Sequence, residues 1–319
     1  FAIAGKQIVP PSQLASALAN VDVGDSGNVA LIVGGVAENS PYAAAIRSAA
    51  TAFAAAKNAK LCRIPQGANA LGLSRAGVLP RTRDAQTMLR EPRKAYVLYG
   101  IEPGLDFADQ QVAMKALGPA QVVAFSQFAC TSTRAVADVI LPIGALPEVD
   151  ASLTNLDGTE QQAQPAGKLP GQAHSGWRVL RALGGDLQVA GFEFTDLAGL
   201  RASFAPHAVQ VAKGAAVVVS GNGLEGAASQ AIYRVDAVTR RCDALQAHPL
   251  TTGPRAVLHP TDAAGLADGT MVKLATASGN ATLPVRLDVR VAAGSVWIES
   301  GYGATAPLVS AGKLEVARA

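Results

Sequence analysis

The sequence has 319 residues, of which 49% are hydrophobic and 16% charged. This is enough apolar material for one or two cores and argues against a disordered chain. The 32 glycines and 18 prolines, with only 5% aromatic residues, favour a turn-rich α/β architecture over a helical bundle. A formal net charge of +3 without a cluster of Lys or Arg gives no basis for nucleic-acid binding. Every apolar stretch is broken before the roughly 18 residues of a membrane span, so we expect no direct membrane insertion.

The first half of the sequence alternates apolar runs with helical patterns. Residues 29–33 predict a strand, and Gly34-Gly35 leads from it toward a helix over 40–57, with Ser40 as N-cap and Pro41 at the first helical position. A glycine pair before a helix can bind phosphate, although such a pair more often only makes a tight turn. The next strands are expected at 95–99, 121–125 and 139–141, with helices over 106–117 and 131–137 between them. This alternation indicates a mostly parallel sheet covered on both faces.

The second half changes character twice. Residues 147–172 show little periodicity and predict a long loop, followed by a helix over 175–183. Residues 229–241 carry apolar side chains at a spacing of three and end in Arg240-Arg241, which favours a helix with basic residues at its carboxyl end. From about Pro249 short strands separated by turn signals predict a small β-barrel. We therefore predict an α/β domain over 1–246 with a helical connector, and a barrel domain over 247–319.

Metal-binding patterns are missing from the sequence. Cys62, Cys130 and Cys242 are too few and too far apart for an iron-sulfur cluster, which usually needs four thiolates. The four histidines show no zinc-ligand spacing. No Gly-x-Ser-x-Gly motif is present, and Glu148 with Asp150 fits turn chemistry better than an acid/base pair. We predict no metal site and no catalytic residue in this chain.

Three stretches, in this order, resemble the molybdopterin oxidoreductase superfamily. They are the segment 99–103 (Tyr-Gly-Ile-Glu-Pro), the segment 137–142 (Ala-Asp-Val-Ile-Leu-Pro), and the loop 148–159, which contains Leu-Thr-Asn-Leu-Asp-Gly-Thr. Further on, His-Pro-Thr-Asp-Ala-Ala at 259–264 resembles the C-terminal dinucleotide-binding barrel of that superfamily. The resemblance implies a doubly wound, mostly parallel α/β region followed by a small barrel.

Within this superfamily, residues 232–246 resemble the large iron-sulfur subunit of bacterial respiratory complex I more than a formate dehydrogenase or a nitrate reductase. That resemblance implies an N-terminal region with iron-sulfur clusters, which this sequence does not contain. The chain begins at Phe1 without an initiator Met or a basic leader, so we interpret it as a piece cut from a longer subunit.

The resemblance assigns candidate cofactor-binding positions to Gly100, Glu102, Asn155 and Thr159. Thr131 is a further candidate, because its hydroxyl could reach a ligand, although helix capping is the more common role of such a residue. Two of them depart from the pattern. Glu102 stands where the family has Asn and would set a carboxylate against an anionic cofactor. Thr159 stands where the family has Arg, so a bidentate phosphate contact is lost. Both departures predict a vestigial pocket, no cofactor in this chain, and in particular no molybdopterin.

The predicted function is therefore a structural and assembly module of NADH:quinone oxidoreductase (complex I). Its expected partners are the remainder of the large iron-sulfur subunit and the neighbouring peripheral-arm subunits, on the cytoplasmic side of the bacterial inner membrane. The chain alone is expected to be inactive and colourless. Two alternatives stay open: a cofactor-binding fragment of a true molybdopterin oxidoreductase such as a formate dehydrogenase, and a free-standing nucleotide-binding protein.

Overall fold

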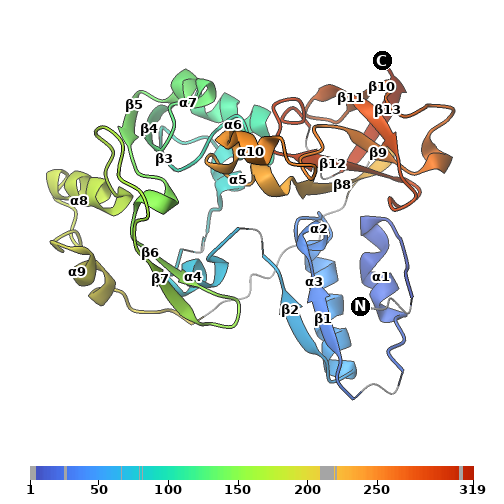
Figure 1. Ribbon diagram of the computed structural model, residues 1–319, viewed down its shortest axis with the longest axis horizontal. Coiled ribbons are helices and arrows are strands. Elements are labelled where there is room, and N and C mark those ends of the chain that lie inside the picture. The colour runs from blue at the N-terminus through green and yellow to red at the C-terminus, as the bar shows by residue number, and fades with distance from the viewer. Residues whose placement is uncertain are drawn as a thin grey trace.

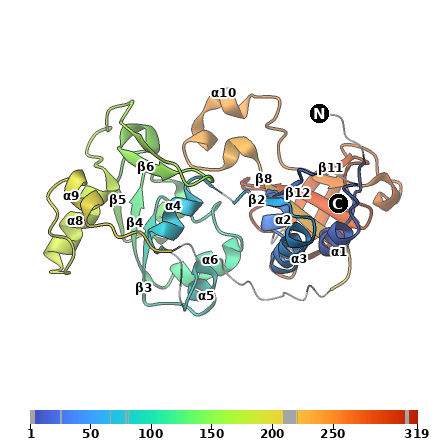
Figure 2. The same ribbon diagram turned by 90° about the horizontal axis from the view of Figure 1, so that it is seen from below.

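The computed structural model describes residues 5–24, 27–65, 67–78, 80, 82–208, 219, 221–308 and 312–319. Its strands form two parallel sheets, an antiparallel hairpin and a closed barrel. The expected α/β region with parallel sheets and a C-terminal barrel is confirmed. Figure 1 shows the barrel and the larger parallel sheet at opposite ends, with helices α6 and α10 (Asp243–Gln246) between them, and Figure 2 agrees.

The first unit of the chain is a small parallel sheet with three helices. Strand β1 (Ala30–Val33) pairs with β2 (Lys60–Arg63), and α1 (Leu14–Ala19), α2 (Gly35–Glu38) and α3 (Ala43–Ala56) surround them. Its core is formed by Val33, Ile46 and Ala50. The expected helix start at Ser40 is wrong. The Ser40 hydroxyl accepts a hydrogen bond from the Tyr42 amide (3.1 Å), which makes a turn before α3 begins.

The second unit is a three-stranded parallel sheet, β3 (Ala95–Tyr99), β4 (Gln121–Ser126) and β5 (Val139–Pro142). Helices α5 (Ala85–Arg90), α6 (Gln110–Leu117) and α7 (Thr131–Val136) accompany it, after the short α4 (Ala70–Arg75). Leu98, Leu117 and Val122 are buried between the sheet and its helices. Helix α6 begins later than expected because the Asp109 carboxylate accepts a hydrogen bond from the Val112 amide (3.0 Å) and caps it there.

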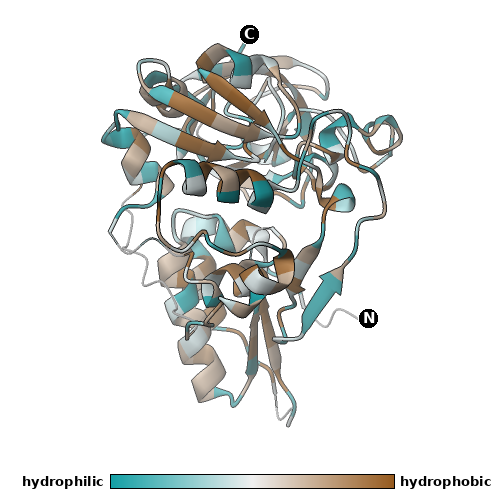
Figure 3. Cartoon of the chain, turned by 90° about the vertical axis from the view of Figure 1, so that its left-hand side faces the viewer, coloured by the Kyte–Doolittle hydropathy of each residue, from teal (hydrophilic) through white to brown (hydrophobic). Residues whose placement is uncertain are grey.

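The segment 147–172 is not only a loop. It contains the hairpin β6 (Ala151–Thr154) and β7 (Glu160–Ala163), and is followed by α8 (Gly176–Asp186) and α9 (Leu197–Ala202). Gly158 in the turn has φ +91°, a conformation that side chains rarely adopt. Figure 3 shows largely hydrophobic strands elsewhere in the molecule, whereas the sequence of β7 is Glu-Gln-Gln-Ala. A polar, exposed strand carries no apolar pattern, so periodicity missed the hairpin.

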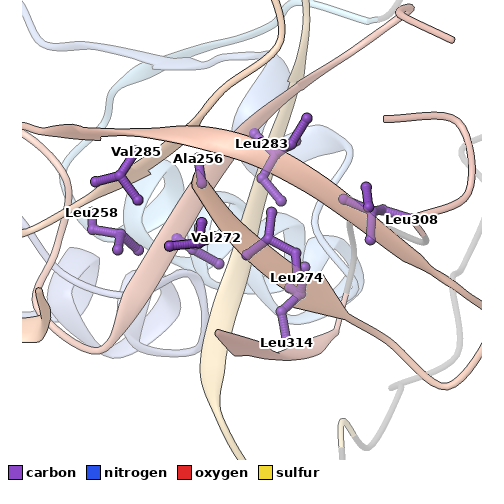
Figure 4. Packing of buried hydrophobic residues seen from close by; sticks show 11 residues of the cluster. Ala256, Leu258, Val272, Leu274, Leu283, Val285, Leu308 and Leu314 are labelled. Carbon is purple, nitrogen blue, oxygen red and sulfur yellow. The ribbon is translucent and has the colours of Figure 1, made fainter. Parts of the chain in front are cut away.

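The barrel closes in the order β10-β11-β9-β12-β8-β13. Its strands are β8 (Leu224–Gln230), β9 (Ala256–Leu258), β10 (Met271–Ala275), β11 (Asn280–Leu287), β12 (Ser295–Ser300) and β13 (Lys313–Arg318). Figure 4 shows the side chains that meet inside it, among them Leu258, Leu274 and Leu314, which are fully buried. Alternate residues of β10 and β11 point inward, as a closed barrel with a side-chain-filled interior requires.

The helix expected over 229–241 is wrong. Strand β8 continues to Gln230, and the rest forms the 3₁₀ turns Ile232–Arg234 and Thr239–Arg241. The Asp236 carboxylate accepts hydrogen bonds from the amides of Val238 (2.8 Å) and Thr239 (2.7 Å), which favours tight turns over a continuous helix. The apolar residues at spacing three are exposed and mark no buried face.

The connector, which we define as residues 231–249, links β8 to the rest of the barrel. The domain boundary at 246/247 stays a prediction. Strand β8 precedes this boundary in the sequence and is nevertheless part of the barrel. No strand crosses residues 246–252, where a break was expected. Among the described residues, none of the helices has the length and apolar character to cross a membrane.

Candidate functional site

A cavity of about 900 Å³ lies between the first unit and the barrel. The two parts are joined beside it by Ser12, whose amide and hydroxyl donate to the two carboxylate oxygens of Glu225 on β8, at 2.6 and 2.8 Å. Figures 1 and 2 both place α2 next to the barrel. The volume lies within the usual range for a small-molecule site. It is therefore large enough for a nucleotide-sized ligand.

Three arginines from the barrel line this cavity: Arg255, Arg286 and Arg290. Arg290 forms a two-pronged ion pair with Asp288, with its closest nitrogen 2.6 Å from the carboxylate. This pairing holds the pKa of Asp288 well below its usual range, chiefly through the hydrogen bonds from Arg290. Arg286 makes no ion pair with any of the described residues. Its guanidinium group is thus the available cation of the cavity wall, of the kind that binds phosphate.

Two further polar groups of β12 line the cavity. Ser295 is 1% exposed, and its hydroxyl has no hydrogen-bond partner among the described residues. Burying a hydroxyl without a partner costs free energy. Glu299 accepts a hydrogen bond from the Thr252 hydroxyl (3.2 Å), and burial raises the pKa of its carboxyl group above the ordinary value. The cavity thus contains an unused hydrogen-bonding group and a carboxyl group that gains a proton readily.

Gly34 and Gly35 form the opposite wall, where β1 ends. Ligands in open α/β sheets bind at the carboxyl ends of the strands. A Cβ atom at Gly34 would meet no atom within 4 Å, so the backbone is open to the cavity. The glycine pair singled out in the sequence therefore lies at the cavity. Helix α2 has only four residues and adds no N-terminal anion site of its own.

The predicted position Glu102 lies elsewhere, in the loop after β3. Its carboxylate is 3% exposed and receives hydrogen bonds from Arg240 and Arg241 of the connector, each at 2.5 Å. Arg240 also pairs with Asp106. Gly100, at the start of the same loop, has φ +65°, and its amide donates to the Phe125 carbonyl (2.8 Å). The interpretation of Glu102 as an unpaired, repulsive carboxylate is wrong, because two guanidinium groups neutralise it.

The same contacts decide the protonation state of Glu102. Burial raises the pKa of this carboxyl group, while the hydrogen bonds and charges of Arg241 and Arg240 lower it, and the net shift is downward from 4.5. The group is therefore ionised at neutral pH. Arg240-Arg241, expected at a helix end, instead turn inward to this carboxylate.

The other predicted positions are not at the cavity. Thr131 is exposed at the start of α7, whereas its neighbour Ser132 accepts a hydrogen bond from the Gly104 amide (3.0 Å) and ties α7 to the β3 loop. Asn155 and Thr159 are exposed in the β6–β7 turn, where the Asn155 amide donates to the Thr159 carbonyl (2.8 Å). Their role as ligands stays a prediction. In the described ranges no group of three or more His, Cys, Asp or Glu residues could hold a metal ion.

Sequence reasoning missed Arg286, Ser295 and Glu299 as members of one site. A usable signal was present, because an apolar strand pattern with an arginine, such as Val285-Arg286-Leu287, puts that arginine on the outer face of a barrel. Which outer face meets Gly34 depends on the packing of the first unit, and no local pattern contains that information.

Two family models match the chain. The model described as molybdopterin oxidoreductase matches residues 13–186, and the model described as molybdopterin dinucleotide binding domain matches residues 230–316. The cavity lies between the two matched regions, with Gly34 in the first and Arg286 and Ser295 in the second.

Comparison with solved structures finds acetylene hydratase from Pelobacter acetylenicus at 18% identity and a TM-score of 0.48. The match covers 66% of this chain and 37% of that one, so the chain corresponds to just over a third of that protein's length. Comparison with curated proteins finds no match.

The expectation that molybdopterin does not bind is contradicted by the match to the dinucleotide-binding model. The residues of the cavity fit the nucleotide part of such a group. The guanidinium group of Arg286 can pair with a phosphate, and the Ser295 hydroxyl, which has no partner among the described residues, can donate a hydrogen bond to it. The open backbone at Gly34 leaves room for the ligand to approach closely. The argument against the cofactor from the charge of Glu102 also falls, since Glu102 is paired.

Membership of the family rests on the extent of the first match. It spans more than half of the sequence, from α1 to the end of α8, and the second match follows it in order over the connector and most of the barrel. The two matched regions correspond to the parallel sheets and to the closed barrel of the structure. The chain belongs to the molybdopterin oxidoreductase family.

Proposed function

We propose that this chain is the cofactor-binding part of a molybdopterin-dependent oxidoreductase, of which a formate dehydrogenase is one example. The cavity between the first unit and the barrel would hold the dinucleotide half of the cofactor. The observation that carries this proposal is the buried Ser295 hydroxyl, which has no partner among the described residues and lines the same cavity as Arg286. A bound phosphate oxygen would supply the hydrogen bond that this hydroxyl lacks.

Each lining residue has a role in this proposal. Arg286 and Arg255 would neutralise phosphate oxygens, and Ser295 would donate a hydrogen bond. The indole of Trp297, which also lines the cavity, offers an aromatic surface to a base. When bound, the cofactor would carry molybdenum or tungsten and supply the oxidation and reduction chemistry. The residues of this chain would bind and orient its nucleotide end.

Calorimetric titration with guanosine diphosphate tests the site, because this probe carries a base and two phosphates. We expect saturable binding to the chain and at least about tenfold weaker binding to Arg286→Gln, the loss of one charge-assisted contact. Arg318→Gln is the matched control, since Arg318 is an exposed arginine on β13 of the same barrel that does not line the cavity. Equal affinities of all three proteins, or no binding by the chain, would contradict the proposal.

A second candidate is a role in the large iron-sulfur subunit of respiratory complex I. It is supported by the connector, because the segment 232–246 that resembles that subunit also contains Arg240 and Arg241, which pair with the buried Glu102. The partners would be the remainder of that subunit and its peripheral-arm neighbours, on the cytoplasmic side of the inner membrane. Exposed apolar residues on the second unit, Val97 and Val139, offer a surface for such contacts.

Metal analysis of the full-length protein separates the two candidates. Molybdenum or tungsten in stoichiometric amount supports the first, whereas iron without either metal, together with co-purification of NADH dehydrogenase activity, supports the second. A full-length protein that contains no iron and purifies without that activity would contradict the second.

A further inference from the structure

The molecule has two parallel sheets, and an anionic ligand could bind at the carboxyl ends of the strands in either one. The residues found at these strand ends differ between the two sheets. The carboxyl end of β1 opens into the cavity. The carboxyl ends of β3 and β4 are instead followed by loops that contact the connector. Glu102 and Asp106, after β3, pair with Arg240. Phe128, after β4, lies under the guanidinium group of Arg241, which is 4.2 Å from the ring centroid.

Both arginines are held in place by contacts that do not involve Glu102. The Nε of Arg240 donates to the Arg234 carbonyl (3.1 Å), and one amino group of Arg241 donates to the Ala237 carbonyl (2.8 Å). Gln246 fastens the same turns by donating to the carbonyls of Tyr233 (3.0 Å) and Thr239 (2.7 Å). The backbone of the connector therefore positions two guanidinium groups toward one point. Two converging arginines at the carboxyl end of a parallel sheet form an oxyanion-binding arrangement.

The group at that point is a carboxylate of the chain itself. Arg240 donates to one oxygen of Glu102 and Arg241 donates to the other, each at 2.5 Å. A phosphate presents oxygens with the same charge and the same hydrogen-bonding capacity. Glu102 is also fixed from its own loop, because its amide donates to Asp106 (2.7 Å). No external anion can reach both arginines while this carboxylate is in place, since the side chains of Glu102 and Arg240 are each only 3% exposed.

We propose that Glu102 acts as an internal anion that closes a second phosphate site, formed by Arg240 and Arg241 at the carboxyl ends of β3 and β4. The parent chain then binds no external oxyanion at the carboxyl ends of β3 and β4. Removal of the Glu102 side chain opens this site to an inorganic oxyanion. The proposal goes beyond the proposed function and does not depend on it, because its site shares no residue with the cavity.

Inorganic pyrophosphate is the probe, and Glu102→Ala is the opening variant, because it removes both the charge and the volume of the buried side chain. We expect calorimetry to find an additional site in Glu102→Ala, with affinity at least about tenfold above any binding by the parent chain at that place. Arg286→Gln is included as the background in all proteins, so that binding at the cavity is weakened throughout. The triple variant Glu102→Ala/Arg240→Gln/Arg241→Gln should lose the additional site again.

Thermal unfolding gives a second readout if Glu102→Ala is poorly folded. Pyrophosphate should raise the unfolding temperature of this variant, or restore its folding, relative to sodium chloride of equal ionic strength, and should leave the triple variant unchanged. A Glu102→Ala protein that neither binds pyrophosphate nor is stabilised by it would overturn the proposal. It would show that Glu102 only fastens the connector. Failure of guanosine diphosphate to bind at the cavity would leave this result unaffected.

Discussion

The barrel and the three-stranded sheet of the second unit differ in how completely they are covered. In the barrel every strand has two neighbours, and Leu274 and Leu314 are fully buried. In the second unit β3 and β5 are edge strands, and Val97 and Val139 are 62% and 47% exposed. Parallel sheets are normally covered on both faces. The barrel therefore completes its own core, whereas the sheet leaves apolar surface open on one face.

The two parts therefore depend to different degrees on contacts with neighbouring segments. A closed barrel needs no neighbour to satisfy its strands. The second unit is joined to the connector by the ion pairs of Glu102 and Asp106 with Arg240 and Arg241. Substitutions at the ion pairs, in the two cores and at the cavity test this difference between the two parts.

The largest effect is expected from the ion pairs. Glu102→Gln leaves two arginines without their shared partner, and removing one member of a buried pair costs about 3–5 kcal/mol. Chemical unfolding should show this loss in the free energy of unfolding. Arg83→Gln is the control, because its pair with Glu91 is exposed and such pairs contribute about 0–1 kcal/mol. Equal losses for both variants would contradict the assigned difference.

The ion pairs also predict an acid limit of stability. The pKa of Glu102 is lower in the folded chain than its ordinary value of 4.5. Its contribution is therefore complete above that value and is lost as the pH falls through the lower, folded pKa. The free energy of unfolding of the parent chain should decline below pH 4.5 more steeply than that of Glu102→Gln. Parallel pH profiles would show that this carboxylate is not responsible.

The two cores should respond differently to truncation. Leu274→Ala removes a fully buried barrel side chain and should cost about 2–5 kcal/mol. Val97→Ala, on the open face of β3, should change the stability of this chain by about 0.5 kcal/mol or less. A large loss for Val97→Ala would mean that the face is covered in solution, and denaturant unfolding would detect it.

A smaller effect with two opposite signs is expected at the cavity. Ser295→Ala removes a buried hydroxyl that has no partner among the described residues, so the ligand-free chain should gain roughly 1 kcal/mol. The same change should weaken guanosine diphosphate binding, because the ligand loses a donor. Thermal unfolding and calorimetry measure the two effects separately. A variant that is destabilised and binds normally would assign Ser295 to packing alone.

The smallest effect is the pH dependence of binding at the cavity. Burial raises the pKa of Glu299 in the folded chain, so lowering the pH toward that value neutralises a carboxylate beside the three arginines. Affinity for an anionic probe should increase modestly as this proton is gained, and Glu299→Gln should abolish that increase. Calorimetry checks both statements at several pH values, all of them high enough that Glu102 stays ionised.

The sequence predicted the parts of this fold whose pattern is local. Strand β3 was placed at its observed ends, because five apolar or aromatic residues between turns allow no other assignment in an α/β context. The helix over 229–241 was wrong because apolar spacing says nothing about exposure, and Asp236 stabilises turns there. The β6–β7 hairpin had a readable signal in Asp157-Gly158.

The site could be predicted only in part. Gly34-Gly35 was recognisable as a possible phosphate contact, but its partner Arg286 comes from another domain. The pairing of Glu102 with Arg240 spans 138 positions along the chain. The sequence around either residue gives no indication of its partner. The charge of Glu102 was therefore evaluated without its neutralising partners, and one of the two arguments against a cofactor followed from that omission.

The central claim, that the cavity holds the dinucleotide half of a molybdopterin cofactor, is tested most directly by the pterin content of the full-length protein purified from cells. Acid extraction and fluorescence would quantify pterin per chain, with Arg286→Gln measured beside the parent and Arg318→Gln as control. The account predicts stoichiometric pterin in the parent and in the control, and a clear reduction in Arg286→Gln. Pterin absent from the parent, or present equally in Arg286→Gln, would contradict it.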